Sequence, residues 1–317
     1  MSVKLELMPE KIIIGTRGSP LALVQANIVK DEIAKISQDI DVVLRIIKTS
    51  GDWKPEDGEV RLEALAGGKA QFATEIEEAL LVGEIDIAVH SMKDMETVLP
   101  DGLVIPYMLP RADPRDAYLS DISQNISSLP MGCVVGTSSV RRQAFLLNKR
   151  PDLKIEVFRG NVQTRIDKLR AGKVDATFLA CAGLNRLGLS HEITSIIDID
   201  DMLPAAAQGA VGIEMREADM NKLAFISQFA CEKTYICVEC ERGVLRALGG
   251  SCHTPVGVHA VLDGTEMHLR VQIVSLDGKQ IYSEDERREV NIIKEANAFG
   301  KEVGTRLKNI VPAEILG

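Results

Sequence analysis

Arginine is concentrated in one segment of this chain. Between Thr137 and Ser190 there are seven arginines and four lysines against four acidic residues, which leaves the segment with a net charge of +7. The whole chain, by contrast, has a formal net charge of −9. A guanidinium group presents a rigid fork of N–H donors that matches the geometry of a carboxylate or a phosphate. The segment therefore indicates a site for an anionic ligand.

Polar side chains suited to such a ligand follow the ends of several expected strands. In an open α/β sheet, ligands collect outside the carboxyl ends of the strands, where helix N-termini also offer free N–H groups. We therefore expect these side chains on one ligand-binding side. They are Arg17 and Ser19 after one strand, Lys93 and Asp94 after another, Thr137, Ser139, Arg141 and Arg142 after a third, and Arg159 after a fourth.

Short β-branched runs alternate with amphipathic stretches over the first two thirds of the chain. This pattern is typical of an α/β sheet with crossover helices. Ser19-Pro20 and Ser138-Ser139 each predict the start of a helix directly after a strand. The expected strands are 11–15, 42–48, 85–90, 103–108, 132–136, 154–158, 174–179 and 210–215.

The last third of the chain changes character. Strands are expected at 256–262, 267–274 and 279–286, with Asp-Gly turns between them, and a helix at 291–309. Asp-Gly between apolar runs is a hairpin signal, so the pattern predicts a small antiparallel meander. We expect a separate α+β domain from about residue 231. Prolines and charges at 110–116 suggest a hinge between the domains that precede it.

Length and composition exclude several classes of protein. A chain of 317 residues with 45% hydrophobic content is long enough for two or three domains. Its acidic balance argues against general nucleic-acid binding, which needs a broad basic surface. No run approaches the roughly 18 apolar residues that span a bilayer, and the first residues do not resemble a secretion signal. We expect a cytoplasmic monomer that contacts neither membrane nor nucleic acid.

Four of the six cysteines crowd between residues 231 and 252. Cys237 and Cys240, with Cys252 and His253 nearby, suggest a zinc or iron–sulfur site. Structural zinc sites usually join two short-spaced ligand pairs, and only one such pair is present. Helical spacing and strong helix formers over 232–248 favour instead two cysteines one turn apart on a helix. We expect no metal.

Seven runs of residues together resemble one family, the porphobilinogen deaminases or hydroxymethylbilane synthases. The resemblance extends over nearly the whole chain in the family's order. The runs are IIIGTRGSPLALVQA, GEIDIAVHSMKD, VVGTSSVRRQA, VFRGNVQTRIDKL, ATFLACAGLNRLGL, MLPAAAQGAVGIE and LGGSCHTPVGVHA.

The resemblance implies an α/β fold with three domains. Two periplasmic-binding-protein-like α/β domains would precede a small C-terminal α+β domain with a three-stranded antiparallel sheet. Residues 1–110 and 207–230 would form the discontinuous first domain, 111–206 the arginine-rich second and 231–317 the third. The family condenses four porphobilinogen molecules head to tail to hydroxymethylbilane in haem biosynthesis, and it carries a covalent dipyrromethane cofactor.

The resemblance also implies roles for individual residues. Asp94 would be catalytic, passing a proton to the leaving amine and stabilising positive charge on the pyrroles. If the chain stays extended after His90, Lys93 and Asp94 point to opposite sides. The dipyrromethane would hang from Cys252, which glycines before it and Pro255 after it set in a loop. Its other ligands would be Lys93, Thr137, Ser139, Arg141 and Arg142, and the porphobilinogen-derived rings would meet Arg17, Ser19, Lys69, Arg159, Arg165, Arg186 and Gln208.

Three departures from the family pattern affect the site rather than the reaction. The family's Gly-Lys-Gly-Leu-Phe, followed by Lys-Glu, reads Gly-Lys-Ala-Gln-Phe-Ala-Thr-Glu over 68–75. Met95-Glu96 replaces Val-Pro after Asp94, which adds a negative charge. Gly249 stands where an acidic residue is common. These changes concern the covering of the active site and its rate.

Two other classes of function remain open from the residues alone. A two-lobed binding protein for a small polyanion would keep the arginines but have no use for Cys252 or Asp94. An anion-dependent transferase would use the turn 15–19 as a phosphate cradle. That turn lacks the spacing and the Lys-Ser/Thr ending of a P-loop. Production of hydroxymethylbilane would separate the three.

Overall fold

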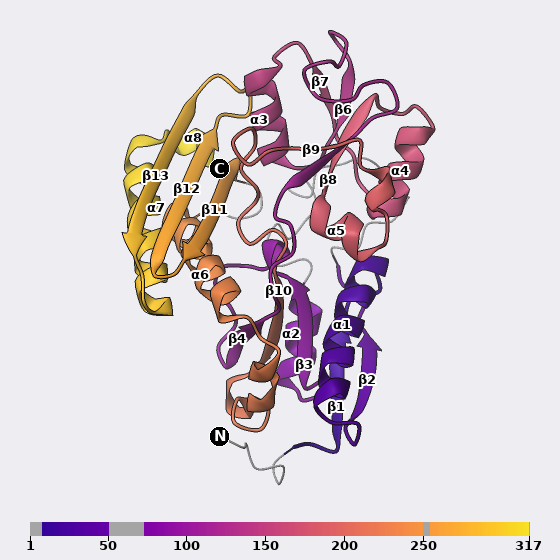
Figure 1. Ribbon diagram of the computed structural model, residues 1–317, viewed down its shortest axis with the longest axis vertical. Coiled ribbons are helices and arrows are strands. Elements are labelled where there is room, and N and C mark those ends of the chain that lie inside the picture. Colours follow the sequence, from indigo (N-terminus) through magenta and orange to yellow (C-terminus); the bar gives the residue numbers. More distant parts are fainter. Residues whose placement is uncertain (1–7, 51–72, 250–253, 317) are drawn as a thin grey trace. The chain divides into compact units, whose positions relative to one another are not determined.

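The computed structural model describes residues 8–50, 73–249 and 254–316 of the chain (Figure 1). The chain divides into two compact units. Unit 1 comprises the described parts of 1–52, 69–111 and 210–235, and unit 2 comprises those of 112–209 and 236–317. The three-domain division expected from the sequence stays a prediction, since unit 2 holds both the arginine-rich region and the C-terminal meander.

Unit 1 is built on a five-stranded sheet with the order β2-β1-β3-β10-β4. The first three strands are parallel, and β10 runs antiparallel to both of its neighbours. The buried face of α1 packs on the sheet through Ala26, Val29 and Ile33. The elements are β1 (Lys11–Thr16), α1 (Pro20–Ile36), β2 (Asp41–Ile46), α2 (Thr74–Leu81), β3 (Ile87–Ser91), β4 (Leu103–Met108) and β10 (Val211–Arg216).

Unit 2 contains a second five-stranded sheet, with the order β7-β6-β8-β5-β9. Strand β6 is parallel to β7 and β8, and β5 is antiparallel to β8 and β9. Tyr118 and Phe178 are fully buried at its centre, with ring centroids 5.7 Å apart. The elements are β5 (Asp116–Leu119), β6 (Val134–Gly136), α3 (Val140–Lys149), β7 (Lys154–Glu156), α4 (Val162–Arg170), β8 (Ala176–Ala180), α5 (Cys181–Arg186) and β9 (Ser195–Ile196).

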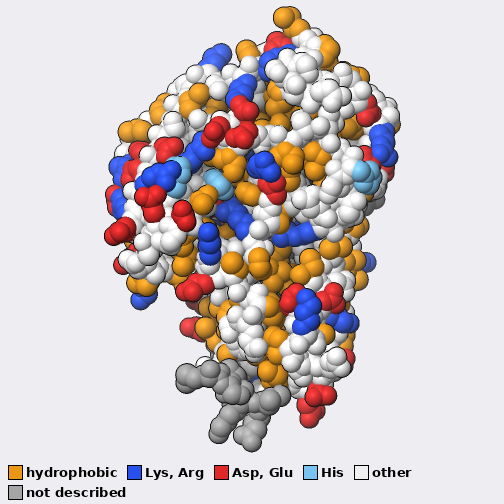
Figure 2. Space-filling model, viewed as in Figure 1, with side chains coloured by type: hydrophobic (Ala, Val, Ile, Leu, Met, Phe, Trp, Pro, Cys, Tyr) orange, Lys and Arg blue, Asp and Glu red, His pale blue; other side chains and the backbone are white. Residues whose placement is uncertain are grey.

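The C-terminal part of unit 2 is an antiparallel meander backed by helices. Strands β11 (Val256–Asp263), β12 (Glu266–Val274) and β13 (Ile281–Glu289) pair in sequence order. Helices α6 (Glu232–Leu248), α7 (Ile293–Ile310) and α8 (Ala313–Leu316) complete this part, and α6 and α7 share one hydrophobic core with the sheet. Figure 2 shows basic and acidic side chains interspersed over the meander, which agrees with ion pairs such as Arg287–Glu266.

Most of the elements expected from the sequence are present. The mixed α/β class, the meander and the helix at 232–248 are confirmed. Two strands were not predicted: β5, which begins at the last residue of the expected hinge, and the two-residue β9. No helix among the described residues is long and apolar enough to cross a membrane.

Candidate functional site

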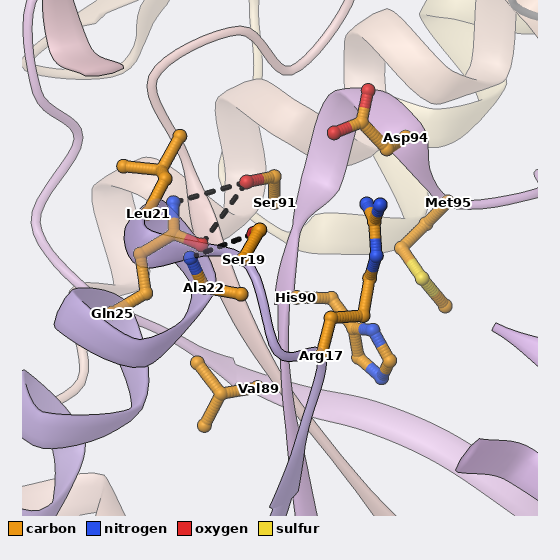
Figure 3. A pocket seen from close by; sticks show the side chains of 10 residues that line it. All are labelled: Arg17, Ser19, Leu21, Ala22, Gln25, Val89, His90, Ser91, Asp94 and Met95. Carbon is orange, nitrogen blue, oxygen red and sulfur yellow. Dashed lines mark hydrogen bonds between the residues drawn. The ribbon is translucent and has the colours of Figure 1, made fainter. Parts of the chain in front are cut away.

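A pocket opens in unit 1 beside the ends of β1 and β3 (Figure 3). Three residues expected at the site line it together: Arg17, Ser19 and Asp94. Gln25 on α1 and Ser91 on β3 also line it, and their side chains are hydrogen-bonded at 3.0 and 3.1 Å. The pocket therefore combines a cation, a carboxylate and neutral polar groups within one unit.

The sequence explains why the turn between β1 and α1 presents these groups. Gly15 lets the end of the Ile85 side chain pack closely, because a Cβ atom there would lie 2.3 Å from Cδ1 of Ile85. Ser19 is the N-cap of α1 and its hydroxyl accepts from the backbone N–H of Ala22 at 3.3 Å. Proline at the first helical position has no N–H to leave unsatisfied. Arg17 lies between the strand and the cap, half-buried at the pocket.

Asp94 lies in a short 3-10 helix, Met92–Asp94, directly after β3. The expected extended chain is therefore wrong at this point, and the alternation of Lys93 and Asp94 does not follow from a strand. A 3-10 turn places consecutive side chains about 120° apart, which still separates the lysine from the carboxylate. The Met92 side chain is buried in the core and holds the turn in place. The Asp94 side chain is exposed and lines the pocket.

A buried acidic cluster lies behind the pocket. His90 lines the pocket, and its Nε2 is 2.9 Å from a carboxylate oxygen of Glu214 on β10. Both side chains are buried, as is Glu77 on α2. Burial, followed by repulsion from Glu214, raises the pKa of Glu77 from 4.5 to about 7, although the positive character of His90 opposes this. The cluster can therefore change its protonation near neutral pH.

Unit 2 brings Arg141 and Arg142 together on one buried carboxylate, that of Asp116. Nη2 of Arg141 lies 2.8 Å from Oδ2 of Asp116, and Nη2 of Arg142 donates to Oδ1 at 2.7 Å. Gln208 donates to the same Oδ1 at 2.9 Å and to the carbonyl of Pro114 at 2.7 Å. All four residues are at least 95% buried. Two guanidiniums on one carboxylate leave a surplus of one positive charge.

The charges of this cluster agree with its contacts. Burial raises the pKa of Asp116, but the Arg141 and Arg142 guanidiniums outweigh it and hold that pKa well below 3.8. Burial lowers the pKa of Arg141 from its ordinary value. Arg141 also donates to the carbonyl of Leu203 at 2.8 Å, whereas its Nε is buried without a hydrogen-bond partner among the described residues. An anion bound at this cluster would stabilise the charged form of Arg141 and would accept a hydrogen bond from its Nε.

Thr137 and Ser139 lie where the sequence predicts, at the start of α3. Ser139 is the N-cap of α3, and its hydroxyl accepts from the N–H of Arg142 at 3.4 Å. Thr137 is buried, and its hydroxyl accepts from the N–H of Ser139 at 3.1 Å. Gly136 is again dictated by packing, since a Cβ there would lie 2.6 Å from the ring of Phe158. The free N–H groups of this helix start suit an anion.

Three further arginines of the expected site also belong to unit 2. Arg159 is buried after β7. Nε of Arg165 donates to the carbonyl of Gly160 at 2.9 Å, and Nη2 of Arg186 donates to the carbonyl of Gly209 at 2.8 Å. Burial lowers the pKa of Arg186. A guanidinium group carries five N–H donors, so one such bond does not use up its capacity.

Some expected residues fall outside what can be placed. Lys69 and Cys252 lie outside the described residues. Cys237 and Cys240 lie on α6, buried in the core that it shares with the meander, as the helical interpretation predicted. In the described ranges no group of three His, Cys, Asp or Glu residues could hold a metal ion.

Four residues of these clusters were not expected from the sequence: Asp116, His90, Glu214 and Glu77. Asp116 belongs to a charged, proline-containing stretch that suggested a hinge rather than a strand. His90 and Glu214 lie within runs that carry the family resemblance, but 124 positions separate them. Acidic residues that recur inside otherwise apolar strand patterns, as Glu214 does, were the available signal.

Two family models match the chain. The model described as "Porphobilinogen deaminase, dipyromethane cofactor binding domain" matches residues 12–224, and "Porphobilinogen deaminase, C-terminal domain" matches residues 235–309. Curated proteins called porphobilinogen deaminase are similar throughout. The one from Nitrobacter hamburgensis is 49% identical over 271 residues, 85% of this chain and 84% of its own length. The one from Chloroherpeton thalassium is 42% identical over 310 residues, 98% of both chains.

Solved structures of binding proteins are similar in fold at low sequence identity. The periplasmic aliphatic sulphonate binding protein SsuA from Escherichia coli aligns with a TM-score of 0.41 and 15% identity, covering 75% of this chain and 70% of its own. The methionine binding protein MetQ aligns with a TM-score of 0.45 and 15% identity, covering 72% of this chain and 93% of its own.

Proposed function

The chain belongs to the porphobilinogen deaminase family, and from this premise we propose how its residues divide the work of that reaction. The reaction joins four porphobilinogen molecules head to tail to give hydroxymethylbilane, with release of ammonia, in tetrapyrrole biosynthesis. The enzyme carries a dipyrromethane cofactor. It is a transferase of the hydroxymethylbilane synthase type, and we propose that it acts as a cytoplasmic monomer.

Asp94 is the catalytic carboxylate. Loss of ammonia from porphobilinogen leaves positive charge on the pyrrole, and a carboxylate beside it stabilises that charge. Asp94 also holds a proton for the leaving amine. The observation that carries this role is the pocket that Asp94 shares with Arg17 and Ser19. Asp94 is exposed within it, so a substrate can reach the carboxylate.

Arg17 and Ser19 hold the incoming substrate, and Lys93 holds the cofactor beside it. Porphobilinogen carries an acetate and a propionate group, and Arg17 binds one of them as a fork of donors. Ser19 keeps its hydroxyl group at the N-terminus of α1, where an anion meets free N–H groups. Lys93 lies in the same short helix as Asp94 and supplies a cation to the dipyrromethane. These contacts orient the reacting carbon against Asp94 and so raise the rate.

The arginine cluster of unit 2 fits the carboxylates of the dipyrromethane. Its positive surplus and the buried, unpartnered Nε of Arg141 suit an anionic group and no cation. When bound, the dipyrromethane supplies the free pyrrole carbon to which the first substrate is joined. Arg141 and Arg142 neutralise its carboxylates. Thr137 and Ser139 bind it at the start of α3, where free backbone N–H groups suit an anion. Gln208 fixes Asp116, which in turn holds both guanidiniums in place.

The remaining arginines serve the growing chain. A chain of six rings carries about a dozen carboxylates, and each partly desolvated charged contact contributes about 1.5–3 kcal/mol. Arg159, Arg165 and Arg186 supply three such contacts from unit 2, whereas Gln208 acts through Asp116, because its Nε2 donates to Pro114 and Asp116. By family resemblance Lys69 joins them, and Cys252 bears the thioether. Both residues lie outside the described part of the chain, so these two assignments rest on the family resemblance.

The deciding experiment is intact mass spectrometry of the purified protein, with peptide mapping across residues 249–259. We expect a mass excess of two linked pyrrole units on Cys252, and consumption of porphobilinogen with release of hydroxymethylbilane. A Cys252→Ser variant should lack the mass excess, while Cys231→Ser keeps it. An unmodified Cys252 in protein made with ample porphobilinogen, together with no turnover, would refute the assignment.

A further inference from the structure

His90, Glu214 and Glu77 have no part in the roles proposed above, although they lie behind the pocket of Asp94. The only ionisable pair among them with a direct hydrogen bond is His90 Nε2 to Glu214, at 2.9 Å. The side chains of the two residues are 5% and 0% exposed. A buried acid and imidazole beside an exposed catalytic carboxylate cost desolvation free energy, so their presence calls for a chemical explanation.

The sheet itself brings His90 and Glu214 together. His90 on β3 stands opposite Gly212 on β10, and Glu214 stands opposite Ala88. The two residues are therefore diagonal neighbours on one face, a separation that long side chains bridge. Met92 packs against Gly212 on the strand, since a Cβ there would lie 2.2 Å from Sδ of Met92. The carboxylate is thus aimed at Nε2 by the register of the strands.

This geometry orients the imidazole toward the pocket. A carboxylate bonded to one ring nitrogen fixes the ring's orientation and stabilises the protonated form, while the other nitrogen handles a proton. Within the described chain, the hydrogen bond of His90 uses Nε2 and His90 lines the pocket, which leaves Nδ1 as the nitrogen to exchange a proton. His90 is therefore equipped as a base.

Glu77 supplies a second negative charge to the same cluster. Its charged neighbours are Glu214 on β10, His90 on β3 and Glu96 after the 3-10 turn. Arg17 lines the same pocket as His90. One oxygen of Glu214 is buried without a hydrogen-bond partner in the described parts of the chain. A cluster with two carboxylates and one imidazole can take up a proton without becoming positive overall, despite the nearby guanidinium.

We infer that His90 is a second proton-handling residue of the pocket, with Glu214 and Glu77 as its positioning carboxylates. The inference rests on the proposed function. In each condensation the C–N bond breaks and its electron pair leaves with ammonia, while a C–C bond forms to the terminal ring. The C–H bond at the α-carbon of the terminal ring, which has formed the new C–C bond, then breaks and returns its electrons to that ring. The released proton passes to Nδ1 of His90 and from there to water, while Asp94 stabilises the cation.

The first test is His90→Gln, with His191→Gln as the control because His191 is exposed and lies in unit 2. General base catalysis contributes about 10²–10⁴-fold to a rate, so we expect kcat to fall at least about 100-fold. KM should change by less than about threefold, since the contacts to the substrate carboxylates remain. A kcat within about threefold of the parent value would overturn the inference.

The second test is Glu77→Gln, with Glu78→Gln as its matched control one position along α2, where the side chain is exposed. In the parent, kcat should rise as pH passes about 7, where Glu77 ionises. Glu77→Gln should flatten that limb, and Glu78→Gln should keep it. An unchanged pH profile in Glu77→Gln would remove the acidic cluster from the mechanism.

A readout that does not depend on turnover completes the design. In parent protein with isotope-labelled histidine, the imidazole signal missing from His90→Gln identifies His90. Its chemical shift should change in Glu77→Gln, because the variant loses a carboxylate that interacts with the imidazole. An unchanged chemical shift contradicts the coupling even if a variant lacks its pyrroles. If the parent itself fails to consume porphobilinogen, the proposed function fails first.

Discussion

The two five-stranded sheets share one topology but bury opposite charges. The orders β2-β1-β3-β10-β4 and β7-β6-β8-β5-β9 correspond strand by strand, with three parallel strands followed by two antiparallel connections in each. Around the sheet of unit 1 the buried charged groups are mainly acidic, Glu77 and Glu214 beside His90. Around the sheet of unit 2 they are mainly basic, with Arg141, Arg142 and Arg159 against Asp116.

The difference in buried charge indicates that the two sheets have different functions. Buried acids do not themselves attract a carboxylate ligand, which in unit 1 falls to Arg17, but Glu77 can exchange a proton near neutral pH. A buried guanidinium surplus stays charged at any physiological pH and attracts carboxylates. Unit 1 therefore suits the chemistry of proton and cation, and unit 2 suits retention of a polyanionic chain. The exposed Asp94 belongs to the first kind of unit.

The strongest way to break this comparison is to neutralise the carboxylate of the unit 1 pocket. Asp94→Asn keeps the shape but removes the charge that stabilises the cation, and we expect turnover to fall at least about 1,000-fold. The pyrrole mass on Cys252 should persist. Asp101→Asn, at an exposed position of the same unit, is the control. Turnover of Asp94→Asn near the parent rate would exclude Asp94 from the mechanism.

Removing the lone acid of the unit 2 cluster should have the next largest effect. Asp116→Asn leaves two guanidiniums in a buried site without their counter-charge, which costs about 3–5 kcal/mol of unfolding free energy. Urea denaturation at pH 7 measures this cost. Asp121→Asn, at an exposed position after β5, is the control.

The same variant has a defined pH dependence. Because the folded pKa of Asp116 lies below its unfolded value of 3.8, its carboxylate stabilises the fold above that pH. The stabilisation is lost as pH falls through the folded pKa. The gap in stability between the parent and Asp116→Asn should therefore be constant above about pH 5 and should narrow below about pH 4. A gap that widens in acid would contradict the assigned charges.

Neutralising a buried acid of unit 1 should have the opposite sign. Glu77 has a folded pKa of about 7 against 4.5. Its proton therefore stabilises the fold at low pH, and this stabilisation is lost as pH rises toward 7 and above. Glu77→Gln should unfold at higher urea concentration than the parent at pH 8, by up to about 3 kcal/mol, and by little near pH 4.5.

Glu78→Gln should follow the parent across this range. A Glu77→Gln protein that is less stable than the parent at pH 8 would mean that the Glu77 carboxylate is paired as Asp116 is. The contrast between the two units would then disappear.

Local patterns in the sequence predicted the parts of this comparison that depend on neighbours in the chain. Ser19-Pro20 predicted the start of α1 and Ser139 that of α3, because helix capping involves residues only two or three positions apart. The Asp263-Gly264 pair predicted a turn of the meander, and Gly264 adopts a φ of 58°, which favours glycine. Arg17 and Asp94 were placed at one pocket by the rule for strand ends in α/β sheets.

The buried charge clusters could not be predicted in this way. Asp116 meets its two arginines only because β5 pairs with β8 and α3 carries Arg141 and Arg142 to that place. Arg142 is also hydrogen-bonded to the carbonyl of Phe178. His90 meets Glu214 through strand pairing across 124 residues. A hydrophobic pattern places such residues inside a strand but does not say which charge faces them. For the same reason the arginine-rich segment predicted an anion site but not the burial of Arg141, Arg142 and Arg159.

The two helix starts offer the finest test, because here the units should behave alike. Ser19 and Ser139 cap α1 and α3 with hydroxyl groups that accept from Ala22 and Arg142, respectively. Each Ser→Ala substitution should cost about 1 kcal/mol of unfolding free energy. Their effects on function should differ, since Ser19→Ala should raise KM for porphobilinogen and Ser139→Ala should lower the yield of protein that carries the pyrroles. Denaturation, kinetics and intact mass separate these outcomes. Equal stability losses with the two functional effects exchanged would assign the substrate to unit 2 and the cofactor to unit 1.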